Sequence, residues 1–465
     1  MAQGKKRMSR LGSEKHSAST ALGLLNLHRA RRSRSTLLHI RVERSISLAL
    51  AGLCLLLSAF STAALADDAP RWGLLNQFQR TMTRAEFQSR LDRVFSPGGA
   101  FQKFLAYDGD SVFIFDDEQH QRRLYRLQLA VDTRRVVKRS FRMLEDLPAL
   151  KNPPGQPLRG LRIALDPGHI GGEFARMEER LFKLNGGPAE QEAVQNILVA
   201  RLLAPQLQRA GATVLFTKND FKPVTDANPE QFRELAAKYV RENVAPRPDV
   251  LAMGDLAREA FLLDATRKRM ELEFYRNAEI RARAALVNDK LRPDLTLCIH
   301  FNAIGDSDRP APDNRLLLMV HGCYTPDSVD TPQRKFDLIW KLLENSHPTE
   351  LAAADAISRA MASDMKLSPE RAKQDPNYAA LNNNPYVYAR NVIANRLFHG
   401  PVVYLEPYYQ NNPTTFSRLL AGDYDGERVF DGQRLRSIFR EYADAVARGV
   451  IEFYRQHTLA VPAGR

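Results

Sequence analysis

Two histidines and two glutamates stand where apolar runs of the chain give way to polar residues. His169 lies in the loop DPGHIGG (166–172), which follows the apolar run 161–165. His300 and Glu406 directly follow two further apolar runs, and Glu192 lies near the start of a predicted helix. Because open α/β sheets place their ligand sites at the carboxyl ends of strands, we expect these four side chains to lie together.

The chemistry that suits these residue types is metal-assisted hydrolysis. Two histidines and one glutamate, with a fourth position left for water, are a ligand set of catalytic zinc sites. A second carboxylate nearby can act as general base. Each residue also has a structural interpretation: strand-end histidines often only form hydrogen bonds, Glu192 would suit a helix N-terminus, and Glu406 could be solvated. Asp166 could accept backbone N–H bonds in the loop or orient His169.

The elements that must position these residues follow an α/β pattern. Buried strands are predicted at 161–165, 213–217, 295–299, 316–320 and 402–405, and amphipathic helices at about 190–209 and 433–457. Pro205 should kink the first of these helices or end it early. The stretch 222–290 is charged and mostly helical. The alternation predicts an α/β fold with a twisted mixed sheet and helices on both faces.

In chain order, these segments resemble the zinc-dependent N-acetylmuramoyl-L-alanine amidases of the amidase_3 type, over about residues 161–458. DPGHIGG is similar to the first zinc-binding loop of that family, and the helix that begins with Glu192 is similar to the second zinc-binding segment. Glu190 is the alternative there, because the preceding loop is long. CIHFNA (298–303) is similar to the third segment, PVVYLE (401–406) to the catalytic segment, and ADAVARGVIEFY (443–454) to the closing helix.

The resemblance implies one Zn²⁺ per chain, bound by His169, Glu192 and His300, with Glu406 as the catalytic carboxylate. It implies hydrolysis of the amide bond between N-acetylmuramic acid and L-alanine in peptidoglycan, the expected substrate. Residues that would support the ligands or contact the substrate are Asp166, Arg283, Asn302 and Asn412.

The chain departs from the family pattern at three places. Pro407-Tyr408 replaces a glycine after the catalytic glutamate, residues 173–188 enlarge the loop between the first two ligands, and 222–290 is longer than a minimal member needs. The long stretch has two interpretations. It could be a helical covering layer, or a lid over the zinc that an activator protein relieves, since some family members are autoinhibited by an inserted helix.

Charge and hydropathy at the N-terminus indicate export. The net charge is +13, yet residues 1–66 contain 11 lysines and arginines against two acidic residues, so the remainder is almost balanced and a nucleic-acid partner is not expected. An uncharged stretch, 45–66, follows the basic segment and ends in Ala64-Leu65-Ala66. This pattern predicts a signal peptide with a long basic n-region and a periplasmic or secreted protein without a later transmembrane segment. An uncleaved membrane anchor is the alternative. Translation that starts near Val42 would account for the unusual length of the n-region.

The domain organisation expected after residue 66 has three parts. Residues 67–150 form a small α+β module of unknown role, with a helix capped by Thr83 that reaches about Val94 and strands at 111–115 and 124–131. Residues 151–160 form a linker, and 161–460 the zinc amidase domain with its helical insertion at about 222–290. Two cysteines remain in the mature chain, Cys298 and Cys323, which could pair or be core thiols.

Two rival functions stay open. One is another zinc amide or peptide hydrolase on a related α/β fold, which would differ in substrate. The other is a non-enzymatic peptidoglycan-binding protein that uses 67–150 as its binding module.

The composition, 44% hydrophobic and 26% charged, is that of an ordinary globular protein and excludes a disordered chain.

Overall fold

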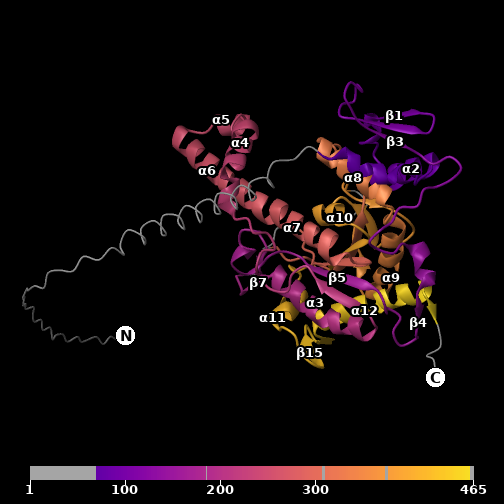
Figure 1. Ribbon diagram of the computed structural model, residues 1–465. Helices are drawn as coiled ribbons and strands as arrows, with labels where there is room; N and C mark the ends of the chain where they lie inside the picture. Colours follow the sequence, from indigo (N-terminus) through magenta and orange to yellow (C-terminus); the bar gives the residue numbers. More distant parts are fainter. Residues whose placement is uncertain (1–69, 185, 306–308, 372–374, 461–465) are drawn as a thin grey trace, which may run out of the picture. The chain divides into compact units, whose positions relative to one another are not determined.

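The computed structural model describes residues 70–184, 186–305, 309–371 and 375–460. These residues belong to one compact unit that begins at Ala69 (Figure 1). The predicted signal peptide and the alternative start near Val42 lie outside the described residues. No helix of the described residues is both long and apolar enough to cross a membrane.

A mixed sheet of eight strands forms the centre of the fold. Its order is β12–β13–β10–β14–β9–β5–β8, with β11 paired to β10. β5, β8, β9 and β14 are parallel to one another, whereas β10 is antiparallel to β14. The strands are β5 (Arg162–Pro167), β8 (Thr213–Phe216), β9 (Leu295–Ile299), β10 (Arg315–His321), β11 (Ser368–Pro369), β12 (Ala379–Ala380), β13 (Val387–Arg390) and β14 (Val402–Pro407). The five predicted strands are therefore confirmed, with ends that differ by at most two residues.

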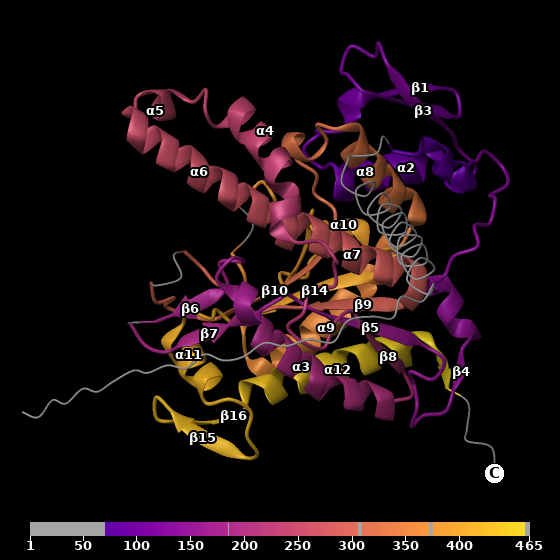
Figure 2. The same ribbon diagram turned by 60° about the vertical axis from the view of Figure 1, so that its left-hand side comes forward.

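Helices cover both faces of this sheet, which confirms the predicted fold class. On one face, α3 (Glu192–Arg209), α9 (His347–Met365) and α12 (Ile438–His457) share a core with Leu165, Leu297 and Val403. On the other, α7 (Glu279–Ala285), the π-helical turn η8 (Leu286–Leu291) and α10 (Ile393–Leu397) pack on Cys298, Met319 and Tyr404. Figure 2 shows α7 on one side of the sheet and α3 with α12 on the other. Alternate residues of each strand thus face different helices.

The two predicted amphipathic helices compare differently with the structure. α3 ends at Arg209, as predicted, so Pro205 does not end it early. Pro205 has no N–H to donate to the carbonyl oxygen of Arg201, four residues earlier. Because Arg201 is exposed, water can donate to this oxygen instead. The last helix begins at Ile438 rather than Gln433, because Gln433–Arg436 is β16 of a hairpin with β15 (Glu427–Phe430). The hairpin turns through Gly432 at φ +77°, which suits glycine and interrupts the helical pattern.

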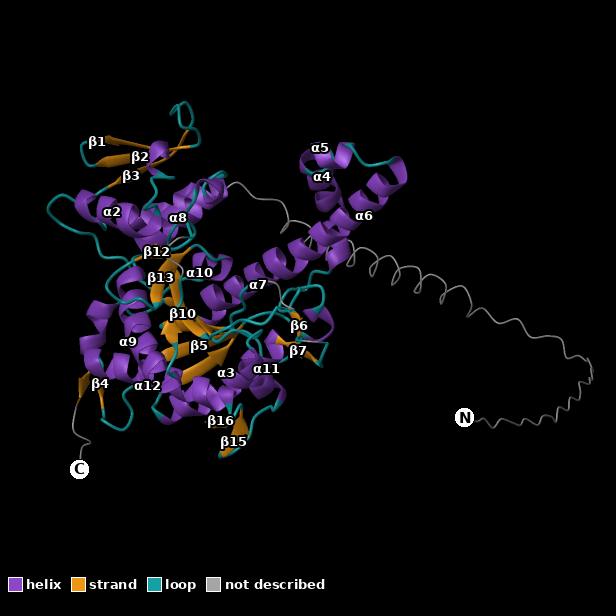
Figure 3. Ribbon diagram, turned by 180° about the vertical axis from the view of Figure 1, so that it is seen from behind, coloured by secondary structure: helices purple, strands orange, loops and turns teal. Residues whose placement is uncertain are grey.

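The N-terminal part contains the predicted helix and strands. α2 (Arg84–Arg90) and the π turn η2 (Leu91–Phe95) follow Thr83, whose side chain and that of Glu86 form a reciprocal capping box. β1 (Leu105–Asp108), β2 (Ser111–Phe115) and β3 (Arg123–Gln128) form a separate antiparallel sheet. Their core also includes α8 (Pro332–Glu344), through side chains such as Leu338. This part therefore shares its hydrophobic core with α8, and Figure 3 shows α2 beside α8.

The stretch 222–290 is helical, as predicted. It contains α4 (Arg233–Asn243), α5 (Pro248–Leu251) and α6 (Asp255–Leu272), which leads through the π-helical turn η7 (Glu273–Ala278) into α7 (Figure 1).

Cys298 and Cys323 are both buried free thiols. The remaining elements are β4 (Lys151–Asn152), β6 (Leu181–Lys183), β7 (Ala189–Gln191), β17 (Leu459–Ala460), α11 (Pro413–Leu420) and the 3₁₀ turns η1 (Trp72–Phe78), η3 (Gln102–Phe104), η4 (Leu144–Ala149), η5 (Gly172–Ala175), η6 (Pro229–Phe232) and η9 (Pro326–Ser328).

A buried histidine at the start of α9 predicts a pH-dependent stability. Burial, with Arg90 and Lys341 nearby, lowers the pKa of His347 from 6.5 to about 4. Between about pH 6.5 and pH 4, His347 is therefore protonated in the unfolded chain but neutral in the folded chain. The free energy of unfolding consequently decreases as the pH falls through this range. Between pH 7.5 and pH 5.5 this residue should lower the free energy of unfolding of the wild type by about 1.4 kcal/mol. His347→Gln has no such group, so its free energy of unfolding should not show this decrease. Urea unfolding of both proteins at both pH values measures this, and equal losses would contradict it.

Candidate metal centre

Three of the predicted ligand residues converge at one edge of the sheet. One ligand atom from each of His169, Glu192 and His300 lies within 4.8 Å of the others. Glu192 Oε1 lies 3.2 Å from His169 Nε2 and 3.0 Å from His300 Nδ1, and the two imidazole rings are 5.0 Å apart between centroids. The cluster lies at the carboxyl ends of β5 and β9 and the N-terminus of α3. The grouping expected from the sequence is present for these three residues.

Strand register and a glycine bring the two histidines together. β5 and β9 are parallel neighbours in which Pro167 pairs with Ile299, so the loops that follow both strands leave the same edge. Gly168 lies against the His300 ring: a Cβ built on it would be 2.0 Å from His300 Cε1. Glycine is thus required before His169 by the close approach of the second histidine.

Replacing Gly168 by alanine should move the His300 ring and weaken metal binding. A displaced ligand should cost about 10- to 100-fold in affinity, the range known for lost support of metal ligands. Competition of Zn²⁺ with a chromophoric chelator measures this. Gly254→Ala is the matched control, because a Cβ there meets no atom within 4 Å and its φ is −64°. Equal affinities for the two variants would contradict the packing argument.

His169 is held by groups on both sides of its ring and at its backbone. Its Nδ1 lies 3.7 Å from Glu178, which also accepts the backbone N–H groups of Ile170 and Gly171 at 2.9 Å each. Its Nε2 accepts a hydrogen bond of 3.3 Å from Arg180 Nε. Burial lowers the pKa of His169, but Glu192 and Glu178 outweigh it and raise the pKa to about 9. The Arg180 contact and metal binding both require Nε2 without its proton, so either one must displace the proton that the two glutamates favour.

Glu192 is a buried carboxylate whose charge is compensated within the cluster. Burial raises its pKa, but the two histidines outweigh this and hold the pKa well below its usual range. Its Oε1 also accepts the Phe301 backbone N–H at 3.4 Å, and its Oε2 lies 3.5 Å from Arg180 Nε. An ionised glutamate in this position is a suitable ligand for a cation. Glu190, the alternative, lies in β7, apart from the cluster, and burial raises its pKa.

Glu406 lies near the cluster, at the end of β14. Tyr404, two residues earlier on the same face of the strand, stacks on the His300 ring with centroids 4.5 Å apart. Burial, together with the charge of Glu192, raises the pKa of Glu406 to about 8. Within the described part of the chain no hydrogen bond holds its carboxyl group, and the charge of Arg390 favours the ionised form, so the group can exchange a proton with a substrate or water.

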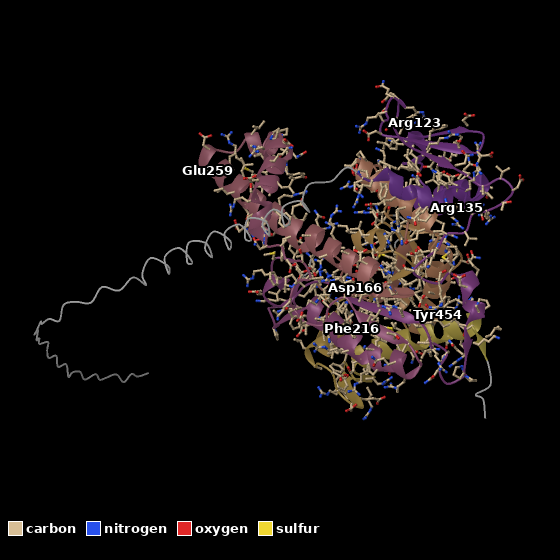
Figure 4. The ribbon with its side chains drawn as sticks, viewed as in Figure 1. Arg123, Arg135, Asp166, Phe216, Glu259 and Tyr454 are labelled. Carbon is tan, nitrogen blue, oxygen red and sulfur yellow. The ribbon has the colours of Figure 1, made fainter. Side chains whose placement is uncertain are left out.

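Asp166 and Arg283 support the loop that contains His169. Asp166 Oδ1 accepts hydrogen bonds from Thr217 Oγ1 at 2.5 Å and Arg283 Nη1 at 3.2 Å. The buried Arg283 also donates to the carbonyl oxygens of Pro167 and His169 at 3.0 and 2.9 Å, and to Glu279 at 2.7 Å. Asp166 belongs to β5 and is labelled in Figure 4. Arg283 therefore holds the His169 backbone directly, and Asp166 holds it through Arg283.

Asn302 and Asn412 lie in the loops after β9 and β14, and neither side chain bonds to the cluster. The Asn302 side chain accepts the Ala303 N–H at 2.8 Å and lies 3.5 Å from Glu370. Asn412 caps α11 by accepting the Thr415 N–H at 3.2 Å. Their observed contacts are those of loop and helix-cap residues.

The sequence interpretation missed several residues around the ligands: Glu178, Arg180, Tyr404, Thr217 and Glu279. Glu178 and Arg180 come from the enlarged loop 173–188, and their charges were the available signal. Tyr404 was part of the recognised segment PVVYLE, but nothing in its type indicated a contact with His300.

Comparisons with known proteins return solved structures only: no protein-family model matches the chain, and no curated protein matches it. The chain is similar to the N-acetylmuramyl-L-alanine amidase Ami1 of Mycobacterium abscessus, at 14% identity and TM-score 0.33, over 64% of this chain and 99% of that one. It is similar to the amidase AmiC2 of Nostoc punctiforme, at 13% identity and TM-score 0.32, over 63% and 97%. A third match is the CwlD amidase of Clostridioides difficile, solved with the GerS lipoprotein, at 13% and 0.33, over 64% and 100%.

All three of these proteins are named as amidases. The fold and the site of this chain are nevertheless defined by its own geometry. It is a mixed α/β protein with a cluster of two histidines and one glutamate that could bind a metal ion at the carboxyl ends of adjacent parallel strands.

Proposed function

We propose that this chain is a zinc-dependent N-acetylmuramoyl-L-alanine amidase that hydrolyses the bond between N-acetylmuramic acid and L-alanine in peptidoglycan. The observation that supports this best is the convergence of His169, Glu192 and His300 within 4.8 Å, with the unpaired carboxylate of Glu406 nearby. The substrate follows from the motif resemblance in the sequence. The cluster geometry supports hydrolytic metal chemistry in general.

The donor set fits a divalent cation of the zinc type. Two imidazole nitrogens and one carboxylate oxygen leave room in a tetrahedral shell for a further ligand. When bound, Zn²⁺ supplies Lewis acidity, which activates water and stabilises negative charge on the amide carbonyl oxygen. The buried Glu192, already ionised in the cluster, provides the negative charge that such a cation requires.

The remaining roles belong to the side chains of this protein. Glu406 accepts a proton from the attacking water and then delivers it to the leaving amine of L-alanine, because it is the unpaired carboxylate at the site. Its raised pKa makes the protonated form accessible near neutral pH, as the second step needs. Arg283 and Asp166 keep the His169 backbone in place.

Digestion of purified peptidoglycan tests the proposal directly. The protein is incubated with the substrate, with and without a chelator, and the products are identified by mass spectrometry. Release of stem peptides with a free L-alanine N-terminus, lost on chelation and restored by Zn²⁺, is the expected result. Cleavage within the stem peptides would instead identify another zinc peptide hydrolase. Sedimentation with peptidoglycan without any cleavage would favour the binding protein.

We also propose that residues 1–66 are removed on export and that the mature protein acts in the periplasm or outside the cell. The charge pattern of the segment supports this. N-terminal sequencing of the protein from the cell envelope should begin at Asp67. A chain that retains its basic segment would contradict cleavage.

The role of 222–290 is tested by shortening it. The hydrogen-bond and ion-pair partners of the three ligand residues include none from α4, α5 or α6, within the described ranges. We therefore expect that replacing residues 229–272 by a short glycine-serine linker leaves basal peptidoglycan cleavage unchanged within about twofold. A clear rise in basal activity would identify a lid, and an activator protein would then be sought as its partner.

A further inference from the structure

The enlarged loop 173–188 contains an arginine whose guanidinium group contacts the ligand cluster. Arg180 Nε donates a 3.3 Å hydrogen bond to His169 Nε2 and lies 3.5 Å from Glu192 Oε2. One guanidinium therefore contacts two of the three candidate ligand residues. It does so at His169 Nε2, the atom that also faces Glu192 Oε1 at 3.2 Å.

The chemistry of these atoms makes the contact exclusive. A neutral imidazole has one lone pair in its ring plane, on the nitrogen without hydrogen. Arg180 Nε–H donates to Nε2, so this contact requires the lone pair on that atom. That lone pair can accept the Arg180 N–H or bind a metal ion, but it cannot do both. The positive charge beside Glu192 opposes a second cation as well.

We propose that Arg180 is a resident cation of this site, which competes with the divalent metal ion for His169 Nε2 and Glu192 and so sets the metal affinity of the protein. This inference rests on the metal site of the proposed function. It goes beyond it by assigning a role to the loop that distinguishes this chain.

Other basic residues near the cluster do not fit this role. Arg283 is buried and is held by Asp166, Glu279 and two carbonyl oxygens. Lys218 donates to the carbonyl oxygens of Ile170 and Asp220. Among the described residues, Arg180 is thus the cation that contacts candidate ligand atoms directly. Its side chain is 41% exposed, so it can leave the cluster without crossing the protein core.

The loop itself does not depend on the Arg180 side chain. Glu178 binds the backbone of Ile170 and Gly171, and the backbone N–H of Arg180 donates to Ala175 O at 2.8 Å. Apart from the cluster, the guanidinium donates only to the carbonyl oxygen of Glu179 in the described structure. Substitution of this side chain should therefore change the cluster and leave the loop folded.

Zinc affinity measured without any substrate tests the proposal. Metal-stripped wild-type protein, Arg180→Gln and Arg180→Lys compete for Zn²⁺ with a chromophoric chelator at pH 7.5. Arg180→Gln should bind Zn²⁺ about 10- to 100-fold more tightly, since the ion no longer displaces a charge-assisted hydrogen bond. Arg180→Lys keeps the charge and should remain closer to the wild type. Arg176→Gln, an exposed arginine of the same loop, is the matched control and should not differ from the wild type.

Unchanged or weaker Zn²⁺ binding by Arg180→Gln would overturn the inference, and weaker binding would identify Arg180 as a support of the ligands. Circular dichroism and thermal unfolding of each variant establish that it is folded. Failure of the proposed function looks different, because the wild type itself would then bind no Zn²⁺ that depends on His300. Titration of the wild type beside His300→Ala therefore separates the two failures.

Discussion

Glu406→Gln should lose peptidoglycan cleavage, with kcat lower by about 10²- to 10⁴-fold, while it keeps its bound metal. Glutamine has the size of glutamate but cannot accept the proton, and Glu406 is not among the residues that form the ligand cluster. Release of stem peptides gives the rate, and inductively coupled plasma mass spectrometry gives the metal content. The combination of full metal content and lost turnover distinguishes a catalytic group from a ligand.

Glu427→Gln is the matched control for this substitution. Glu427 lies on the exposed β15–β16 hairpin and pairs only with Arg434 across it. The control should therefore keep wild-type kcat and metal content. A Glu406→Gln enzyme with a rate close to the control would show that another group takes the proton.

His300→Ala should lose metal and activity together. The substitution removes one of three ligands, so the loss of Zn²⁺ affinity should exceed the roughly 10- to 100-fold cost of losing an outer partner of a ligand. It also leaves the buried Glu192 carboxylate without its 3.0 Å partner. Chelator competition gives the affinity, and the same peptidoglycan digestion gives the activity.

His120→Ala serves as the control for a histidine outside the site. His120 is exposed, stacks on Phe115 and donates from Nε2 to the carbonyl oxygen of Lys103 in the N-terminal part of the chain. It should keep Zn²⁺ affinity and turnover. If His300→Ala also kept full metal content, the ion would bind elsewhere and the ligand assignment would be wrong.

Local patterns in the sequence determined the strands and most of the helices. Each buried strand has a mostly apolar run, and the capping box at Thr83 marks the start of α2 by chemistry confined to four residues. His169, His300 and Glu406 could be proposed as site residues because they end such runs, and parallel strands bring their carboxyl ends to one edge. The local pattern does not predict the structure correctly where the surroundings of a residue decide. The carbonyl group of Arg201, which has no partner at Pro205, is exposed and can bond to water, so the helix continues. At Gly432 a hairpin replaces the predicted first turn of the last helix.

Only the tertiary structure decided which residues support the ligand cluster and which charges surround it. Arg283 reaches the His169 backbone from α7, more than 100 residues away, and Tyr404 meets His300 through the pairing of β9 with β14. The side chains of Glu178 and Arg180 turn towards His169 because the loop between the ligands folds back on itself, which no periodic pattern encodes. The sequence by itself thus determined which side chains can bind a metal. The charges that tune their affinity come from long-range contacts, which exist only once the sheet has formed.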